Sequence, residues 1–312
     1  MTISVLHTAD AWWVKTPDGA AKIETSATTT AQLLADRVAV EAAATSTDTD
    51  GLETLKLVSP VTRPCRVVAQ MTNFESHVRD AGMDPASMLL TFFRKASASI
   101  NGPFDDIIKP QHVKLLDYEV EIGLVVGRAI PVGTSISDAN LADFIAGLVV
   151  TNDVSARDIQ LPQTQFYEAK SYPTFTPVGP ELVLLTADEL NRFGDLRLRL
   201  SVNGDERQNA LVEGDMLYRP LQALQSLTQF QELAPGDLVL TGTPVGTALS
   251  APPKPIQLIG NLLPPAVKWK AFFKRQAANP KYLQHGDVVE ASVATDDGTI
   301  DLGTQRNTVQ YA

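Results

Sequence analysis

The clearest hydrophobic pattern in the chain is an alternation of apolar and acidic side chains between positions 115 and 127. Apolar or aromatic residues occupy the even positions from Leu116 to Val126, and Asp117, Glu119 and Glu121 occupy odd positions among them. Successive residues of a strand point to opposite faces, so the pattern predicts a strand with one apolar and one acidic face. Unless water simply solvates the acidic face, the repulsion between its carboxylates has to be offset by bound protons, by Arg or Lys neighbours, or by a cation.

A second apolar run, Leu148 to Thr151, predicts a buried strand that leads directly into Asn152 and Asp153. Polar groups at the end of a buried strand often build a site, although Asp153 could equally cap or turn the chain there. A hard divalent ion would offset an acidic face best, because Mg²⁺, Mn²⁺ and Ca²⁺ take carboxylate oxygens as ligands.

Elsewhere the pattern predicts short strands separated by turn residues. Leu196 to Val202 alternates cleanly and is followed by Asn203-Gly204, the strongest short hairpin signal. We expect further strands at 3–6, 11–15, 20–24, 65–69, 92–95, 182–185, 238–240, 288–293 and 308–311. We expect helices at 28–42, 73–80, 137–146 and 216–231. Many antiparallel strands with few helices predict an α+β, β-rich fold with a β-roll or sandwich-like core.

The expected helix at 73–80 carries a candidate acid–base pair. His77 and Asp80 are three positions apart, so they share one helix face and can touch. A carboxylate bonded to one imidazole nitrogen fixes the tautomer and raises the basicity of the other nitrogen. An exposed helix pair with no catalytic role would show the same spacing.

Composition excludes some classes of protein. The net charge of -10 argues against sequence-independent binding of nucleic acid, because such binding needs a basic face. No apolar run approaches the length of a membrane helix, and the N-terminus lacks the pattern of a signal peptide. Cys65 is the only cysteine, which rules out an internal disulfide and is typical of a reducing cytoplasm. We read it as a buried, inert thiol.

One stretch differs in charge from the rest of the chain. Residues 254–284 contain five Lys and one Arg and no acid, and Lys268 to Arg275 combines basic with aromatic side chains. The simpler interpretation is a surface helix that packs its aromatic residues on the body or on a partner subunit. The alternative is a lid that attracts an anionic substrate.

Six motifs in this order resemble the fumarylacetoacetate hydrolase family, specifically its bacterial acylpyruvate and fumarylpyruvate hydrolase-like members. They are DYEVEIGLVVG, TNDVSARDIQ, AKSYPTFTPVGP, VNG, PGDLVLTGTP and HGDVVEASV, within about residues 60 to 310. The resemblance implies a fumarylacetoacetate-hydrolase-like catalytic domain at 61–312, preceded by a small α+β domain at 1–60.

The resemblance also implies the roles of individual residues. Glu119, Glu121 and Asp153 would bind Mg²⁺, or else Mn²⁺ or Ca²⁺, with Asp117 facing the same way but outside the ligand set. His77 and Asp80 would form the lid pair, although this chain has Asp where a Glu is usual. The residues expected to contact substrate or a developing oxyanion are Arg157, Gln160, Lys170 and, for the substrate carboxylate, Thr243. A homodimer is expected on the same ground.

The implied reaction is hydrolysis of a carbon–carbon bond in an acylpyruvate-type 2,4-dioxo acid, giving pyruvate and a carboxylic acid. The same site could instead decarboxylate oxaloacetate, or hydrate or isomerise an unsaturated 2-oxo acid. A non-catalytic descendant that works through partners is a third possibility, which the presence of His77, Lys170 and Arg157 beside the carboxylates argues against. We expect a small 2-oxo acid as substrate, with no nucleic acid or membrane partner.

Overall fold

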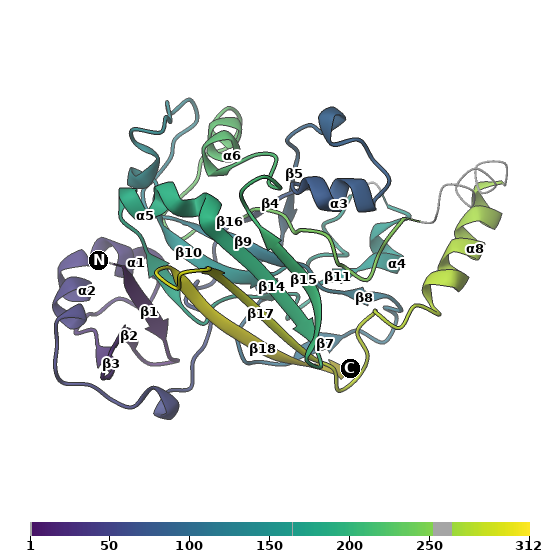
Figure 1. Ribbon diagram of the computed structural model, residues 1–312. Helices are drawn as coiled ribbons and strands as arrows, with labels where there is room; N and C mark the ends of the chain where they lie inside the picture. The colour runs from purple at the N-terminus through teal and green to yellow at the C-terminus, as the bar shows by residue number, and fades with distance from the viewer. Residues whose placement is uncertain (1, 164, 252–263) are drawn as a thin grey trace.

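Two β-sheets form the body of the protein in the computed structural model, which describes residues 2–163, 165–251 and 264–312 (Figure 1). The strands of the larger sheet are β1 (Ile3–His7), β2 (Trp12–Thr16), β3 (Gly19–Lys22), β4 (Val67–Gln70), β5 (Phe92–Lys95), β9 (Val120–Val126), β10 (Ile145–Asn152), β13 (Leu182–Leu184) and β16 (Leu238–Leu240). Their order across the sheet is β3-β2-β1-β13-β10-β9-β16-β4-β5. The long central pair β9–β10 is antiparallel, whereas β16 and β4 run parallel.

The second sheet covers one face of the first. Its strands are β7 (Ile107–Lys109), β14 (Leu196–Val202), β15 (Asp205–Leu211), β17 (Val288–Thr295) and β18 (Asp301–Tyr311), in the order β15-β14-β17-β18-β7. Leu124 of β9, Leu198 of β14 and Val293 of β17 lie in one buried apolar cluster between the sheets. The alternating apolar positions of β14 and β17 point into this core, which explains their clean period of two. The β-rich, sandwich-like α+β fold is therefore confirmed.

Two small strand pairs, seven α-helices and five short 3-10 helices are the other described elements. The pairs are β6 (Ile100–Asn101) with β12 (Thr176–Pro177), and β8 (Leu116–Asp117) with β11 (Ser155–Ala156). The helices are α1 (Thr30–Ala35), α2 (Arg37–Ala44), α3 (Glu75–Asp80), α4 (Arg157–Gln160), α5 (Ala187–Asn191), α6 (Pro220–Leu227) and α8 (Pro265–Gln276). Within the described ranges, no helix is both long and apolar enough to cross a membrane.

The N-terminal strands continue the larger sheet. Strand β1 pairs with β13, where Ile3 lies opposite Leu184, and β2 and β3 extend the sheet beyond it. Helices α1 and α2 cover this end, on the left of Figure 1, and Leu33 and Val40 pack in one apolar cluster with Val67 and Leu182. The sheet thus runs across the expected boundary at residue 60, and the division into domains at 1–60 and 61–312 stays a prediction.

Two expected elements are wrong. The alternating stretch is not one strand, because β8 ends at Asp117, β9 begins at Val120, and the two belong to different sheets. The α-helix expected at 137–146 does not form: the stretch holds only a short 3-10 helix, Leu141–Asp143, before β10 begins at Ile145. Gly147, which resembled a helix stop, lies inside β10, where a Cβ atom would come within 2.2 Å of the Val183 carbonyl oxygen. The glycine permits close strand approach and does not end a helix.

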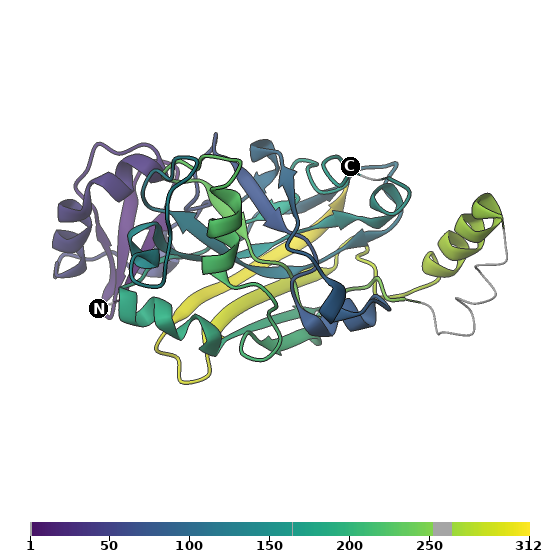
Figure 2. The ribbon, with the colours of Figure 1, turned by 90° about the horizontal axis from the view of Figure 1, so that it is seen from above.

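The basic stretch forms a helix that leaves the body. Helix α8 projects away from both sheets, on the right of Figures 1 and 2. The residues of this stretch before position 264 lie outside the described residues.

Candidate functional site

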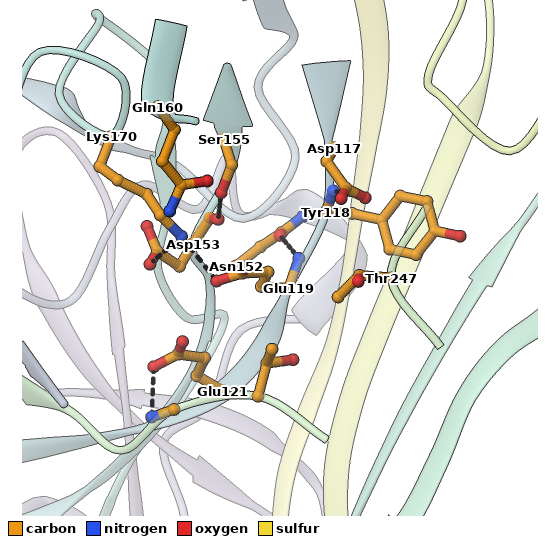
Figure 3. Close-up of polar contacts among 12 residues, drawn as sticks. Asp117, Tyr118, Glu119, Glu121, Asn152, Asp153, Ser155, Gln160, Lys170 and Thr247 are labelled. Atoms are coloured by element: carbon orange, nitrogen blue, oxygen red, sulfur yellow. Dashed lines mark hydrogen bonds and ion pairs between the residues drawn. The ribbon is translucent and has the colours of Figure 1, made fainter. Parts of the chain in front are cut away.

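The pairing of β9 with β10 brings Glu119, Glu121 and Asp153 together. Strands β9 and β10 are antiparallel neighbours in which Glu121 lies opposite Thr151, and the backbone N–H of Asp153 donates to the Glu119 carbonyl at 2.8 Å. One oxygen from each of the three carboxylates lies within 4.8 Å of the others. All three residues are buried, at 5% exposure or less. Figure 3 shows them converging from the two segments that the sequence singled out.

Three buried cations hold two of these carboxylates, Glu119 and Asp153. Lys170 donates to Glu119 Oε2 at 2.6 Å and to Asp153 Oδ2 at 2.7 Å, so it bridges the two segments (Figure 3). Lys95, from the sheet edge strand β5, donates to the other oxygen of Asp153 and to the Phe175 carbonyl at 2.9 Å. Arg157, at the start of α4, pairs with Glu119 through one terminal nitrogen.

Asp117 serves Arg157 and does not join the cluster of three. Its Oδ2 accepts from Nε of Arg157 at 2.8 Å, and its two oxygens also accept from the backbone N–H groups of Ala248 and Leu249. The strand break between Asp117 and Val120 ends the common face that a continuous strand would have given the carboxylates. The expectation that Asp117 faces the same way as Glu119 and Glu121 is therefore wrong.

Charge is unevenly balanced in this buried cluster. It contains four carboxylates and three cations, namely Asp117, Glu119, Glu121, Asp153, Lys95, Arg157 and Lys170. Among the described residues, Glu121 has no Lys or Arg partner, and its one hydrogen bond comes from the Gly242 backbone N–H at 2.7 Å. With every group ionised, the cluster carries one excess negative charge.

The pKa values reflect this imbalance. Burial, Asp153 and Glu119 raise the pKa of Glu121 well above its usual value. Burial also acts to raise the pKa of Glu119, but Arg157 and Lys170 outweigh it and bring that pKa down to about 2. Although burial opposes it, Asp153 and Glu119 raise the pKa of Lys170, which stays charged. Glu121 is therefore the carboxylate that most needs a further cation.

Glu119 and Glu121 line a pocket of about 350 Å³, its open mouth included. The lining residues are Gln70, Met71, Thr72, His77, Phe93, Glu119, Glu121, Arg157, Gln160, Phe166, Lys170, Gly242 and Thr243. Of the nine expected site residues, seven line this pocket; Asp153 lies behind it, and Asp80 lies on α3 beside it.

His77 reaches the pocket without the support expected from Asp80. Helix α3 forms as expected and ends at Asp80, but Nδ1 of His77 is buried with no hydrogen-bond partner. No hydrogen bond joins the two side chains in the part of the chain that the structure describes. Burial lowers the pKa of His77, so the imidazole is neutral at pH 7.

Gln160 and Thr243 are placed by contacts within the protein. Gln160 Oε1 accepts from Arg157 at 2.8 Å, which leaves its amide N–H groups for the pocket. The Thr243 hydroxyl donates to the Val120 carbonyl at 2.9 Å and accepts from Gln208 at 2.8 Å. The hydroxyl proton of Thr243 is therefore already used, and the residue fixes the turn after β16 against β9.

The partners of several site residues could not be predicted from the sequence. Lys95 shares a strand face with Phe93, which lines the pocket, but only the pairing of β5 with β4 brings it to Asp153. Asn152 holds the backbone of Glu119 by accepting from its N–H at 2.9 Å. Alternation within 92–95 could have suggested that Lys95 shares the site face, whereas the Gly242 N–H contact to Glu121 depends on strand order alone.

The residues present fit a hard divalent cation. Three carboxylate oxygens within reach of one another, with no His or Cys among them, form the donor set that Mg²⁺, Mn²⁺ and Ca²⁺ prefer. The oxygens that already accept from Lys and Arg keep a second lone pair. A charge of +2 would also turn the excess negative charge of the cluster into an excess positive one, as an anionic substrate requires.

The sequence motifs and this geometry agree with a comparison against known families. The family described as "Fumarylacetoacetate (FAA) hydrolase C-terminal" matches residues 66–310. The chain belongs to the fumarylacetoacetate hydrolase family. Members of this family are enzymes, and both hydrolases and isomerases occur among its relatives.

Relatives with different reactions are similar to this fumarylacetoacetate hydrolase family member. A mitochondrial oxaloacetate tautomerase of Rattus norvegicus is 35% identical over 198 residues, which cover 63% of this chain and 61% of that protein. The chain thus matches about 61% of the length of the first curated relatives. A 2,4-didehydro-3-deoxy-L-rhamnonate hydrolase of a Sphingomonas species is 32% identical, over 80% of this chain and 75% of its own.

Solved structures share the fold over the full length. A probable 2-hydroxyhepta-2,4-diene-1,7-dioate isomerase from Mycobacterium abscessus is 28% identical with a TM-score of 0.73, covering 100% of this chain and 99% of its own. A putative HpcE protein from Mycobacterium smegmatis is 26% identical with a TM-score of 0.75, covering 100% of both chains. The family resemblance drawn from the motifs is confirmed.

Proposed function

We propose that the protein hydrolyses a carbon–carbon bond in an acylpyruvate-type 2,4-dioxo acid, releasing pyruvate and a carboxylic acid. The observation that carries the proposal is the buried convergence of Glu119, Glu121 and Asp153 beside two cations and a neutral imidazole in one pocket. The relative aligned over 80% of the chain is named as a hydrolase of a 2,4-didehydro-3-deoxy sugar acid, a substrate of the same oxidation pattern.

Glu119, Glu121 and Asp153 would hold the divalent ion, Mg²⁺ or else Mn²⁺ or Ca²⁺. When bound, such an ion supplies Lewis-acid polarisation of a 2-oxo acid and lowers the cost of negative charge on its oxygens. The protein's own contribution begins with Lys170, which uses two of its three N–H groups on Glu119 and Asp153 and has one left for the pocket.

His77 is the proposed general base. Its lowered pKa keeps the ring neutral at pH 7, so it can accept a proton from a water molecule that attacks the C4 carbonyl. A bond forms between that water oxygen and C4, the C3–C4 bond breaks, and its electron pair passes to C3 as the enolate of pyruvate. The proton then returns to C3, so the balance is one dioxo acid and one water to one pyruvate and one carboxylic acid.

Arg157, Lys170 and Gln160 would orient the substrate. Arg157 is fixed by Asp117, Glu119 and Gln160, which leaves two guanidinium N–H groups without acceptors among the described residues. Those donors and the Gln160 amide suit a carboxylate or a developing oxyanion. Thr243 would contribute through its position at the pocket edge, since its hydroxyl proton is bound to Val120.

A second candidate is tautomerisation or decarboxylation of oxaloacetate, or isomerisation of an unsaturated 2-oxo acid. One observation favours it: His77 lacks the contact with Asp80 that would orient it toward an attacking water. The enolate chemistry is the same, but no water is consumed. The oxaloacetate tautomerase from Rattus norvegicus is similar over 63% of this chain.

One assay separates these reactions. The protein with Mg²⁺ is given acetylpyruvate or oxaloacetate, and pyruvate is measured with lactate dehydrogenase while the loss of enol absorbance is followed separately. Hydrolysis predicts equal amounts of pyruvate and acetate from acetylpyruvate. Enol loss from oxaloacetate without pyruvate indicates tautomerisation, and pyruvate with CO₂ from oxaloacetate alone indicates decarboxylation. Either of these results without acetate formation would reject the hydrolase proposal.

The compartment and the oligomeric state of the enzyme are part of the same proposal. A lone cysteine is consistent with the cytoplasm, and a homodimer is expected from the family.

A further inference from the structure

Gln208 is the one buried residue of β15, the edge strand of the second sheet (Figure 1). Its side chain is polar, yet the residue is only 1% exposed. In the pairing of β14 with β15, the register shifts between Leu200 and Ser201 because β15 carries one extra residue, Arg207. The β-bulge at this extra residue lies directly before Gln208, and bulges redirect the side chains beside them. The irregular strand thus turns a single amide toward the interior.

Every polar atom of the Gln208 amide is bound to a segment that carries the site. Oε1 accepts from the backbone N–H of Val120, in β9, at 3.0 Å. Nε2 donates to the Thr243 hydroxyl and to the Pro244 carbonyl, both at 2.8 Å. An amide nitrogen has two protons, so both of its donors are used. Gln208 therefore joins β9 to the turn after β16 from the opposite sheet.

The two segments joined in this way carry Glu121 and its hydrogen-bond donor. Val120 directly precedes Glu121, and its carbonyl accepts from the Thr243 hydroxyl at 2.9 Å. Gly242, next to Thr243, donates its backbone N–H to Glu121 Oε2 at 2.7 Å. Because Glu121 has no Lys or Arg partner among the described residues, this backbone contact is what places its carboxylate. Gln208 holds both sides of that contact.

A glycine lets the bulge come close enough for this contact. A Cβ atom on Gly246 would lie 2.0 Å from the Arg207 carbonyl oxygen, which is backbone, and Gly246 has a φ of 115°. The chain that follows the turn after β16 therefore packs directly against β15, with no side chain between them. This approach keeps Gln208 within reach of Val120 and Thr243.

We propose that Gln208 is a positioning residue that fixes Glu121 in the geometry that a small divalent ion requires. Residues that orient metal ligands from behind typically change metal affinity by about 10–100-fold when they are replaced. Mg²⁺ demands near-ideal octahedral geometry at short distances, whereas Ca²⁺ accepts longer and less regular ones. Loosening the support of Glu121 therefore harms Mg²⁺ binding more than Ca²⁺ binding. The inference rests on the proposed metal site, but it does not depend on which oxo acid reacts there.

Calorimetric titration of Mg²⁺ and, separately, of Ca²⁺ into metal-free protein tests the proposal. Gln208→Met keeps the length of the side chain and removes its amide. We expect the Mg²⁺ affinity of this variant to fall by about tenfold or more. The Ca²⁺ affinity should fall by less than about threefold, because a flexible coordination shell tolerates a displaced carboxylate.

The matched control is Gln305→Met. Gln305 is also fully buried and also reaches from the second sheet to the first, but it donates to the Val150 carbonyl of β10, at 2.8 Å. Its replacement removes a buried amide between the sheets without touching the turn after β16. The ratio of Mg²⁺ to Ca²⁺ affinity should therefore stay as in wild type, whatever the loss of stability that urea unfolding records.

A second variant covers the case in which Gln208→Met does not fold. Thr243→Val removes the hydroxyl that Gln208 binds and keeps the branched shape of the side chain, so it should show the same selective loss of Mg²⁺ affinity. Unchanged Mg²⁺ affinity in the folded variants, equal losses for both ions, or the same change of ratio in Gln305→Met would overturn the proposal. If wild type binds neither ion, the metal site itself is wrong and the role of Gln208 falls with it.

Discussion

Each buried cation around the pocket pairs with a carboxylate, and Lys95 is the simplest case to test. It is 2% exposed and pairs with Asp153. Replacing it in Lys95→Met leaves the Asp153 carboxylate with one cation where it had two, so we expect a loss of about 3–5 kcal/mol in the free energy of unfolding. The measurement is urea unfolding in metal-free buffer.

The matched control is Arg306→Met. Arg306 pairs with Glu290 at 3.4 Å, and the two side chains are 58% and 41% exposed. Water replaces the lost partner there, so the expected change is below about 1 kcal/mol. Equal losses of unfolding free energy in the two variants would show that the buried charge of Asp153 does not explain the effect of Lys95→Met.

The separation between His77 and Asp80 leads to a prediction about catalysis. His77→Asn should lower kcat by about 10²–10⁴-fold, since a general base is removed, while Mn²⁺ binding stays unchanged. Asp80→Ala should change kcat by less than about tenfold, because no hydrogen bond joins its side chain to the ring. Steady-state kinetics decides this, and a loss in Asp80→Ala as large as in His77→Asn would contradict the structure.

The lowered pKa of a second histidine, His7, predicts how the free energy of unfolding depends on pH. His7 stacks on Trp12 with ring centroids 3.8 Å apart, and burial lowers its pKa despite a hydrogen bond to the Ser59 carbonyl at 2.8 Å. Below the ordinary His pKa of about 6.5, the unfolded chain binds a proton that the folded chain does not. The free energy of unfolding should therefore fall from pH 7 to pH 5 more steeply in wild type than in His7→Phe. Parallel pH curves would contradict this.

At the scale of elements, the edge between β10 and β13 depends on one glycine. A Cβ atom on Gly147 would lie 2.2 Å from the Val183 carbonyl oxygen, which is fixed backbone. We expect Gly147→Ala to cost about 3 kcal/mol and to loosen β13 together with β1, which pairs with it. Urea unfolding measures the cost, and hydrogen exchange of the β1 amides reports the loosening.

Gly133→Ala is the control for this variant. Gly133 has open space around it, so the substitution there meets only the cost of a φ of 84°. That cost is about 1–2 kcal/mol, and the β1 amides should stay protected. If the β1 amides exchange faster in Gly133→Ala, or do not exchange faster in Gly147→Ala, the contact with Val183 is not the cause of the loosening and the prediction is wrong.

Strands with one polar face were predictable from the sequence, because alternation records burial directly. The strand β14, the turn at Asn203-Gly204 and the strand β16 all lie where the pattern places them. The helix expected at 137–146 failed because apolar residues near a glycine fit either a helix or a strand. Only the contact of Gly147 with Val183 decides between them.

The same limit applies to the site. The three carboxylates could be predicted because they lie at or beside the ends of two predicted strands, whereas Lys170 was implied only by the family motif AKSYPTFTPVGP. Lys95 and the Gly242 N–H could not, since each reaches the cluster through the order β9-β16-β4-β5 of the sheet. The break after Asp117 was hidden because apolar alternation continues through Tyr118 although the chain changes sheets there.

For the whole molecule, charge makes the case for a bound cation. The protein carries a net charge of -10, and with every group ionised the buried cluster at the pocket accounts for one excess negative charge of that total. An anionic oxo acid would be repelled by both. A divalent ion beside Glu121 reverses the local sign, so binding of the ion and of the acid should be cooperative.

The most direct test of this account is calorimetric titration of Mn²⁺ into wild type and into Glu121→Gln, each with and without oxalate. Glu121→Gln keeps the shape of the side chain and its contact with the Gly242 N–H, but it removes the charge that no Lys or Arg among the described residues balances. We predict one Mn²⁺ per chain in wild type, tighter binding with oxalate, and at least 100-fold weaker binding in the variant. Failure of wild type to bind Mn²⁺, or equal affinity in both proteins, would contradict the account.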